Sequence, residues 1–442
     1  MLKPSFAGLP PGPSLPRAVQ TALLWRFPRW WLDTCHRRYG DVFAVHAAPM
    51  GTLVFLADPA DIKTVFAGDP AVYRAGEAAS VLRGILGDGS LLLLDEQRHR
   101  DRRRLMMSPF HRDAVHRQSE LMAEIAAADV AAWPLAREFP VAPRMAAITL
   151  EVILRIVIGS RDERRLCALR RALPAVVEAN PLATMAMANP DLLRRRPWRG
   201  VRRRREEADR LLFTEIAHCR ADPELADRTD VLAMLVRAAD SDGRGMTDAE
   251  LRDQLMTLLM AGHETTATAL SWALERLVRH PEVLRRAVEA ADTGDEDYLD
   301  AVVRETLRIR PVVFDVARTL AAPVELGGYR LPAGVLVSPA IGLVQLSARH
   351  YPDPKRFAPE RMIGTTPSPT TWLPFGGGAR RCLGATFAQV EMRIVLREVL
   401  RRVELVPTSG SGERQRMKLI TLVPHRGGRI RVRARRAAPV PA

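Results

Sequence analysis

The sequence is poor in cysteine and has no long apolar segment. Its four cysteines, Cys35, Cys167, Cys219 and Cys382, form no C-x-x-C pair, which argues against a disulfide framework and favours a reducing compartment. The apolar run at residues 22–25 ends at Arg26, whereas a membrane span needs roughly 20 apolar residues. No secretory signal is visible either. We therefore expect a cytoplasmic protein without a membrane span.

Signals for nucleic-acid binding are also missing, although the chain is basic. The net charge is +15, from 66 basic and 51 acidic residues, and such an excess is one feature of nucleic-acid-binding proteins. The excess is almost entirely arginine and is spread along the chain, without zinc-finger spacing or a ribonucleoprotein aromatic motif. We therefore expect no nucleic acid, and we expect the positive charge to steer an acidic protein partner.

Apolar residues make up 47% of the chain, which is enough for a large core. A chain of 442 residues could hold two or three ordinary domains or one large enzyme domain. Residues 1–20 are rich in proline, which sustains neither a helix nor a central strand, so we expect an extended lead-in packed on the surface. Residues 435–442 are expected to form a short tail after a body at 21–434.

Apolar periodicity predicts a mainly α fold with small β-sheets. Helices are predicted at 26–39, from Pro59 with Asp58 as the N-cap, at 114–160, at 164–178, onward to about 239, and at 247–280. Strands are predicted as a hairpin of 41–45 with 52–56, as pieces of 322–338, and as a closing hairpin within 416–434. Glycines recur through residues 75–95, which we expect to be a mobile loop.

The chemistry is concentrated at residues 375–384, where a glycine-rich loop leads into a predicted helix. Cys382 follows two arginines in this stretch, and amides at a helix start together with cations favour a thiolate. A thiolate there could be a nucleophile, a zinc ligand or a ligand of haem iron, or the residue could be a buried structural cysteine. Zinc needs several ligands, and no other Cys or His lies between Tyr351 and His425.

Five residues of this stretch match the haem-binding loop of the cytochrome P450 family at every fixed position of Phe-x-x-Gly-x-Arg-x-Cys-x-Gly. They are Phe375, Gly378, Arg380, Cys382 and Gly384. The chain therefore resembles that family over about residues 9–434. The resemblance implies that Cys382 ligates the iron of a b-type haem, with Phe375, Gly376, Arg380 and Gly384 contacting the cofactor.

The middle of the predicted 247–280 helix breaks a local rule, because Gly262 and two threonines lower helix stability there. A zinc-protease motif beginning at His263 would need histidine at position 267, which is Ala267. The segment from Ala261 resembles the oxygen-binding groove of the P450 family, Ala-Gly-x-Glu/Asp-Thr-Thr. That resemblance implies that Ala261 lines the haem, that Thr265 hydrogen-bonds dioxygen and that Glu264 supplies protons. Alternatively, Thr265 only bonds a carbonyl of its own helix.

Two further sets of residues extend the resemblance. His99 and Arg103 lie four positions apart on one helix face, and the family has haem propionate ligands at this spacing and at the position of Arg318. Glu305 and Arg308, together with Arg361 further on, match the structural Glu–Arg–Arg network of the family. The loop at 75–95, the proline-broken segment at 179–199 and residues 312–316 would cover or line the substrate pocket.

The resemblance implies one mainly helical domain, with haem between the 247–280 helix and the Cys382 loop. The implied reaction inserts one oxygen atom of O2 into an apolar substrate such as a lipid, steroid or terpenoid, by hydroxylation or epoxidation. Electrons would come from NAD(P)H through a reductase and a ferredoxin, docked near Arg102, Arg104, Arg112 and Arg381. We expect a monomer. A peroxide-driven or isomerising haem-thiolate enzyme and a haem-based sensor or ligand carrier are the alternative hypotheses.

Overall fold

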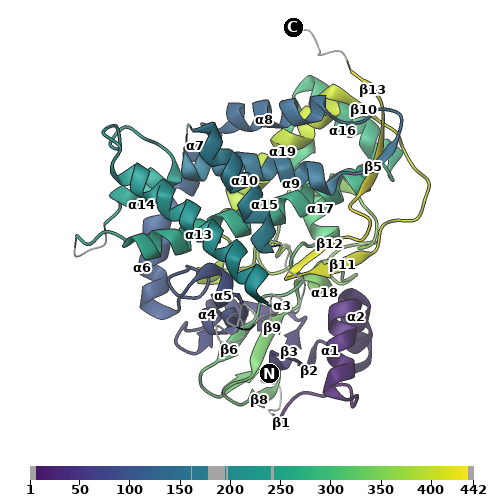
Figure 1. Cartoon of the computed structure of the whole chain (residues 1–442). Coiled ribbons are helices and arrows are strands. Elements are labelled where there is room, and N and C mark those ends of the chain that lie inside the picture. The colour runs from purple at the N-terminus through teal and green to yellow at the C-terminus, as the bar shows by residue number, and fades with distance from the viewer. Residues whose placement is uncertain (1–5, 161, 178–194, 196–197, 240–242, 437–442) are drawn as a thin grey trace.

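Helices dominate the computed structural model, which describes residues 6–160, 162–177, 195, 198–239 and 243–436. Figure 1 shows a helical body around the long helix α15, with a smaller region of strands at one end beside α1 and α2. This arrangement confirms the predicted mainly helical fold with small sheets. The proline-broken segment at 179–199 lies almost entirely outside the described residues.

The helices of the N-terminal half are α1 (Arg17–Arg26), α2 (Pro28–Tyr39), α3 (Pro59–Ala67), α4 (Ala75–Ala78), η1 (Ser80–Leu82), α5 (Arg83–Leu86), α6 (Glu96–Met107), η2 (Ser108–Phe110), α7 (Arg112–His116), α8 (Ser119–Ala131), α9 (Ala142–Ile153), the π-helix η3 (Leu154–Ile158), α10 (Glu163–Val177) and α13 (Arg199–Arg220). Those that follow are α14 (Val231–Arg237), α15 (Asp248–Leu277), α16 (Pro281–Thr293), α17 (Glu296–Ile309), α18 (Ile341–Gln345), η5 (Pro359–Met362), η6 (Gly378–Arg380) and α19 (Ala385–Arg402).

The strands are β1 (Phe6–Ala7), β2 (Val42–Ala47), β3 (Gly51–Leu56), β4 (Tyr73–Arg74), β5 (Glu138–Pro140), β6 (Arg318–Leu320), β7 (Val324–Leu326), β8 (Tyr329–Leu331), β9 (Leu336–Pro339), β10 (Val403–Leu405), β11 (Gln415–Lys418), β12 (Thr421–Pro424) and β13 (Arg429–Arg435). They form a five-stranded sheet in the order β2-β3-β9-β6-β4, two three-stranded sheets (β1-β8-β7 and β10-β13-β5) and the hairpin β11-β12.

The long helix α15 is the centre of the main core. Its N-terminus is a capping box, in which the Thr247 hydroxyl accepts from the Glu250 amide and the Glu250 carboxylate accepts from the Thr247 amide. It ends at Leu277, three residues before the predicted His280. Most of its residues are buried, because α9, α13, α17 and α19 pack around it. Such burial on several sides is typical of a core helix.

The predicted hairpin at 41–56 and the predicted N-cap at Asp58 are both present in the structure. The hairpin of β2 with β3 has the register Val42↔Leu56 through Ala47↔Gly51, and the rings of Phe43 and Phe55 stack across it at 5.5 Å. The side chain of Asp58 caps α3 by accepting from the amide of Ala60. Both predictions are confirmed, because each depended only on residues close in the sequence.

Four predictions about longer segments were wrong. The predicted helix at 114–160 is interrupted between Ala131 and Ala142, where β5 pairs with β13. The predicted closing hairpin does not form, because β12 pairs with β11, whereas β13 pairs with β10 and β5. Residues 75–95 contain the short helices α4, η1 and α5 rather than a continuous loop. The lead-in is also shorter than expected, since α1 already begins at Arg17.

No helix among the described residues combines the length and the apolar character that crossing a bilayer requires.

Candidate functional site

The Cys382 loop is shaped by glycines and by contact with α3. Gly376 and Gly378 both have φ +63°, a left-handed conformation that glycine adopts without steric strain. A Cβ on Gly378 would also lie 1.9 Å from the carbonyl oxygen of Phe66, so no larger residue fits. The Cys382 amide donates to the Phe375 carbonyl at 2.9 Å and closes the loop. Cys382 itself is exposed, and α19 begins three residues later.

The electrostatics of the Cys382 thiol differ from the sequence-based expectation. Although the Cys382 side chain is accessible, the many protein atoms around it disfavour a charged sulfur and raise the pKa of the thiol, and the opposing effects of the Gly384 amide, Arg103 and Arg381 are smaller. Cations and a helix start therefore do not outweigh desolvation here. Coordination to a metal cation would act in the opposite direction and favour the thiolate.

Three of the predicted propionate ligands gather beside the Cys382 loop with few negative charges near them. His99 is 4% exposed, and burial together with Arg380 and Arg103 lowers its pKa to about 4. Burial and the nearby Arg380 lower the pKa of Arg318 to about 10. Arg103 donates to the Arg381 carbonyl at 2.7 Å, which links α6 to the loop. Two guanidinium cations, Arg103 and Arg318, beside an imidazole that can donate a hydrogen bond favour an anionic ligand.

Arg380 has a carboxylate partner that sequence reasoning did not find. Its guanidinium pairs with Asp95 at 2.6 Å, and Asp95 also accepts from the amides of Gly76 and Glu77 at 2.8 and 3.0 Å. Asp95 therefore ties the start of α6, α4 and the Cys382 loop together. No short sequence pattern joins positions 95 and 380, so only the folded chain reveals this contact.

The middle of α15 contains an opening in an otherwise buried helix. Ala261 is exposed and Gly262, Glu264 and Thr265 are half-buried, whereas the flanking turns are almost wholly buried. Gly262 lets α9 approach closely, since an added Cβ would lie 3.0 Å from the Ile153 side chain. The Thr265 hydroxyl donates to the Ala261 carbonyl at 2.7 Å, which is the bond of the purely structural alternative. Its oxygen lone pairs remain free to accept.

Glu264 makes a contact that sequence reasoning also missed. Its carboxylate lies 2.8 Å from the Lys418 ammonium, at the end of β11, and the two side chains are 16% and 34% exposed. The hairpin carrying Lys418 is attached to α15 through the Trp272 indole, which donates to the Leu422 carbonyl at 2.8 Å. Lys418 therefore holds Glu264 in one orientation beside Thr265.

His263 faces away from this opening. It is 3% exposed, and its Nδ1 lies 2.6 Å from the Leu259 carbonyl oxygen of the preceding turn. Thr149 of α9 donates to the His263 carbonyl at 3.0 Å. These are packing contacts between two core helices.

The α15 opening and the Cys382 loop belong to packed neighbours. Glu391, on α19, hydrogen-bonds the hydroxyl of Thr266 on α15, and burial raises its pKa well above the ordinary range. Because Glu391 lies on the helix that begins just after Cys382, this contact fixes the orientation of α19 against α15.

Glu305 is the centre of a buried charge network. It is fully buried and accepts from Arg308 at 2.7 Å and from Arg361 at 3.2 Å, and the Ala358 amide donates to the same carboxylate at 3.0 Å. Arg308 is equally buried and also donates to the carbonyls of Gln345 and Pro354. The network attaches α17 to α18 and to the segment before η5.

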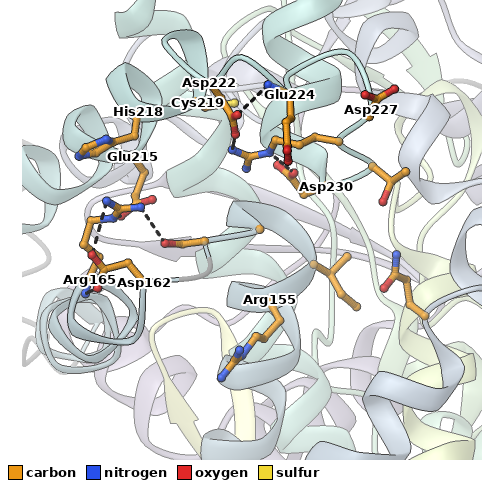
Figure 2. Close-up of a pocket in the computed structure, with 16 residues that line it drawn as sticks. Arg155, Asp162, Arg165, Glu215, His218, Cys219, Asp222, Glu224, Asp227 and Asp230 are labelled. Carbon is orange, nitrogen blue, oxygen red and sulfur yellow. Dashed lines mark hydrogen bonds and ion pairs between the residues drawn. The ribbon is translucent and has the colours of Figure 1, made fainter.

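A large surface cleft lies elsewhere, among η3, the start of α10, the end of α13 and the segment 222–230 (Figure 2), with a volume of about 640 Å3. Its charged residues mostly neutralise one another. Arg165 lies 2.8 Å from Glu215, and Arg228 lies 2.7 Å from Asp230 and 3.0 Å from Asp222. None of the residues around Cys382 or Thr265 lines it, so it is not the candidate site.

Comparison with known proteins identifies the family. The cytochrome P450 family model matches residues 8–430. The chain belongs to the cytochrome P450 family. It is 65% identical over 438 residues to a Mycobacterium bovis protein named cytochrome P450 135B1, covering 98% of this chain and 93% of the relative. It is 40% identical over 427 residues to Mycobacterium tuberculosis cytochrome P450 135A1, covering 96% and 95% of the two chains.

Solved structures agree with this fold. The haem domain of cytochrome P450DA superposes with a TM-score of 0.84 at 24% identity, covering 98% of this chain and 99% of that one. The cyanobacterial CYP120A1, solved with retinoic acid bound, gives 0.83 at 24% identity, with 96% and 99% coverage. At these identities the likeness shows the shared fold alone.

The site has the donor set that a P450 requires. Family membership implies an oxidoreductase of the monooxygenase class with a haem cofactor. The accessible thiol of Cys382, the cations Arg103 and Arg318 and the imidazole of His99 fit an iron porphyrin, which needs an iron ligand and partners for its carboxylates. Among the described residues no group of three or more His, Cys, Asp or Glu could hold a separate metal ion.

Proposed function

We propose that the protein is a haem-thiolate monooxygenase that inserts one oxygen atom of O2 into an apolar organic substrate by hydroxylation or epoxidation. A lipid, steroid or terpenoid would be a suitable substrate. The observation that carries this proposal is the accessible Cys382 thiol, which lies just before α19. Beside it are Arg103 and Arg318, and among the described residues no carboxylate lies within ion-pair distance of either. When bound, a haem with a thiolate ligand supplies the oxygen-activating redox chemistry.

Each residue has a definite task in this proposal. Cys382 would hold the iron of the haem as a thiolate, and His99, Arg103, Arg318 and Arg380 would bind its carboxylates. The other residues assigned to haem contact are Ala261, Phe375, Gly376 and Gly384. Carboxylates arriving beside His99 would stabilise its protonated form, reversing the low pKa caused by burial and neighbouring arginines.

Proton delivery is assigned to the α15 opening. Because the Thr265 hydroxyl hydrogen is engaged by the Ala261 carbonyl, its oxygen faces the site as an acceptor. Glu264 lies next to it in the sequence and is held by Lys418 at 2.8 Å. We assign to Glu264 the passing of protons from solvent into the site, to the Thr265 oxygen the holding of a proton-bearing group by accepting its hydrogen bond, and to Lys418 the positioning of the Glu264 carboxylate. Glu305, Arg308 and Arg361 are structural in this scheme.

The proposed function is tested by spectroscopy followed by turnover. Purified protein is titrated with apolar compounds, and those that shift the haem absorbance are then tested for stimulated NADPH oxidation and product formation with a reductase and a ferredoxin. Ligand-dependent product formation is the expected result. Spectral binding without product under any electron supply would instead indicate a ligand carrier, and product with peroxide alone would indicate a peroxide-driven enzyme.

We predict that Thr265→Ala uncouples oxygen consumption from product formation. Without the hydroxyl, the proton path ends at Glu264, so product per NADPH should fall by about tenfold while O2 consumption continues. The ratio of product to NADPH, with peroxide release as a second measurement, checks this. Thr265→Ser, which keeps the hydroxyl, is the matched control and should remain near the parent. Equal coupling in Thr265→Ala and the parent would refute the assigned role.

Electrons are proposed to arrive from an acidic ferredoxin at the surface beside the Cys382 loop. Arg104, Arg112 and Arg381 are exposed there. Arg102, which the sequence suggested as a fourth docking residue, is instead only 13% exposed and paired with Glu250. It is therefore an internal link between α6 and α15, because its charge is already used.

Reduction by ferredoxin is predicted to slow as salt rises, since charges at this surface are screened over about 8–10 Å at physiological ionic strength. Arg104→Glu should slow the first electron transfer severalfold further, mainly through the association rate. Stopped-flow reduction measured against ionic strength checks both effects. Arg330→Glu, an exposed arginine on β8 in a separate sheet, is the control. Insensitivity to salt and to Arg104→Glu would remove these arginines from the docking surface.

A further inference from the structure

The junction of α1 and α2 carries an exposed aromatic cluster. Phe27 is the only residue between the two helices. Trp25, Phe27 and Trp30 are 37%, 45% and 56% exposed, and the rings of Phe27 and Trp30 lie 6.5 Å apart. Within the described residues, four Trp or Phe side chains are exposed by more than a third, and three of them are these. We call Trp25, Phe27 and Trp30 the aromatic corner.

The aromatic corner is held firmly by the opposite faces of its helices. Trp31, Leu32 and Cys35 of α2 are buried against the sheet, at 5%, 2% and 2% exposure. On α1, the buried Gln20 side chain accepts from the His46 amide at 2.9 Å and donates to the Leu15 carbonyl at 2.7 Å. The exposed rings are therefore presented on a fixed scaffold, because the same helices are anchored by their other faces.

The charge around the aromatic corner is almost entirely positive. Residues 17–39 contain five arginines (Arg17, Arg26, Arg29, Arg37 and Arg38) against the single carboxylate Asp33. Arg37 pairs with Asp33 at 3.2 Å. Among the described residues no carboxylate lies within ion-pair distance of Arg17, Arg26 or Arg38, and the guanidinium of Arg26 stands 4.8 Å from the Phe27 ring centroid. Arg26 thus borders the exposed rings directly, and Arg17 and Arg38 add unpaired positive charge at the far ends of the same two helices.

We propose that the aromatic corner docks the protein on an anionic phospholipid surface. Tryptophan and phenylalanine rings insert at the headgroup level, where their apolar faces leave water while polar edges stay solvated. Arginines beside them bind lipid phosphates through charge-assisted hydrogen bonds. The association is peripheral, and the helices lie against the surface rather than crossing it.

The positive charge also argues against a second copy of this chain as the partner of the aromatic corner. A second copy of this chain would bring the same unpaired arginines, Arg17, Arg26 and Arg38, to the contact, and like charges facing each other oppose association. A protein partner usually receives exposed aromatic residues in preformed pockets. Figure 1 shows α1 and α2 side by side at the outer edge of the molecule, where a broad surface can reach them. Docking would also bring the protein to the lipid phase, in which apolar substrates dissolve. This consequence rests on the proposed function, whereas the proposed membrane binding is independent of it.

The test is cosedimentation of the full-length protein with vesicles, which requires no turnover. Vesicles of phosphatidylcholine containing phosphatidylglycerol should bind the protein, vesicles of phosphatidylcholine alone should bind it weakly, and added salt should release it. The double variant Phe27→Ser/Trp30→Ser should bind roughly tenfold or more weakly, since two exposed rings no longer leave water. Arg17→Ser/Arg26→Ser should bind roughly 30-fold more weakly, since two charges near the anionic surface are lost.

Ile363→Ser is the matched control, because Ile363 is 38% exposed and lies just after η5, away from α1 and α2. Thermal unfolding verifies that all variants remain folded. Equal binding of the parent and Phe27→Ser/Trp30→Ser, or equal binding to charged and uncharged vesicles, would overturn the proposal. The proposal would also be overturned if the parent bound no vesicles but formed a dimer that Phe27→Ser/Trp30→Ser abolishes. Binding of an acidic ferredoxin that depends on the same rings would overturn it as well.

Discussion

Cys382→His is expected to abolish the thiolate-type carbon monoxide spectrum while the protein still binds haem, and to abolish monooxygenase activity with it. Imidazole can ligate iron, so the cofactor can stay. It lacks the negative sulfur that gives the thiolate its electronic effect on the iron. The loop tolerates the exchange at Cys382 better than at its glycines, because the Cys382 side chain is exposed whereas Gly378 has no room for a Cβ.

The measurement is the reduced carbon monoxide difference spectrum, with haem content determined separately. Cys167→Ser is the control, since Cys167 is a free, half-buried cysteine on α10. It should leave the spectrum unchanged. A thiolate-type spectrum in Cys382→His would show that another group is the ligand. If Cys382→His binds no haem, the same spectrum is measured on Cys382→Ser.

Glu305→Gln is expected to lower the free energy of unfolding by about 3–5 kcal/mol, because it leaves the fully buried Arg308 without its charge partner. The amide keeps the shape of the carboxylate but not its charge, so Arg361 also loses its carboxylate contact at 3.2 Å. Because α17 and the segment before η5 would loosen together, haem content should fall in parallel. Chemical denaturation of protein with matched haem content measures the change.

The chain contains a matched control for this prediction. Glu282 pairs with Arg285 at 3.0 Å and the same spacing of three residues, but the two side chains are 86% and 71% exposed. Glu282→Gln should therefore lower the free energy of unfolding by about 1 kcal/mol or less. If Glu305→Gln were as mild as Glu282→Gln, the buried network would not stabilise the fold as its geometry suggests.

Local sequence was sufficient wherever neighbouring residues decide the conformation. The hairpin at β2 and β3, the cap at Asp58 and the start of α15 at Thr247 depend on turn chemistry and capping within a few residues. The loop at residues 375–384 is equally local, because its left-handed glycines are adjacent to the cysteine that they present. The family resemblance, later shown by comparison, rested on such short ordered stretches.

Tertiary structure decided the features that depend on distant partners. Strand pairing is one example, since β13 follows β12 closely in the chain but pairs with β5 at residues 138–140 and with β10. The ion pairs of Arg102 with Glu250, Arg380 with Asp95 and Glu264 with Lys418 are others. The pKa of Cys382 is the clearest case, because desolvation depends on everything packed around the thiol, whereas the cations that suggested a thiolate are visible in the sequence.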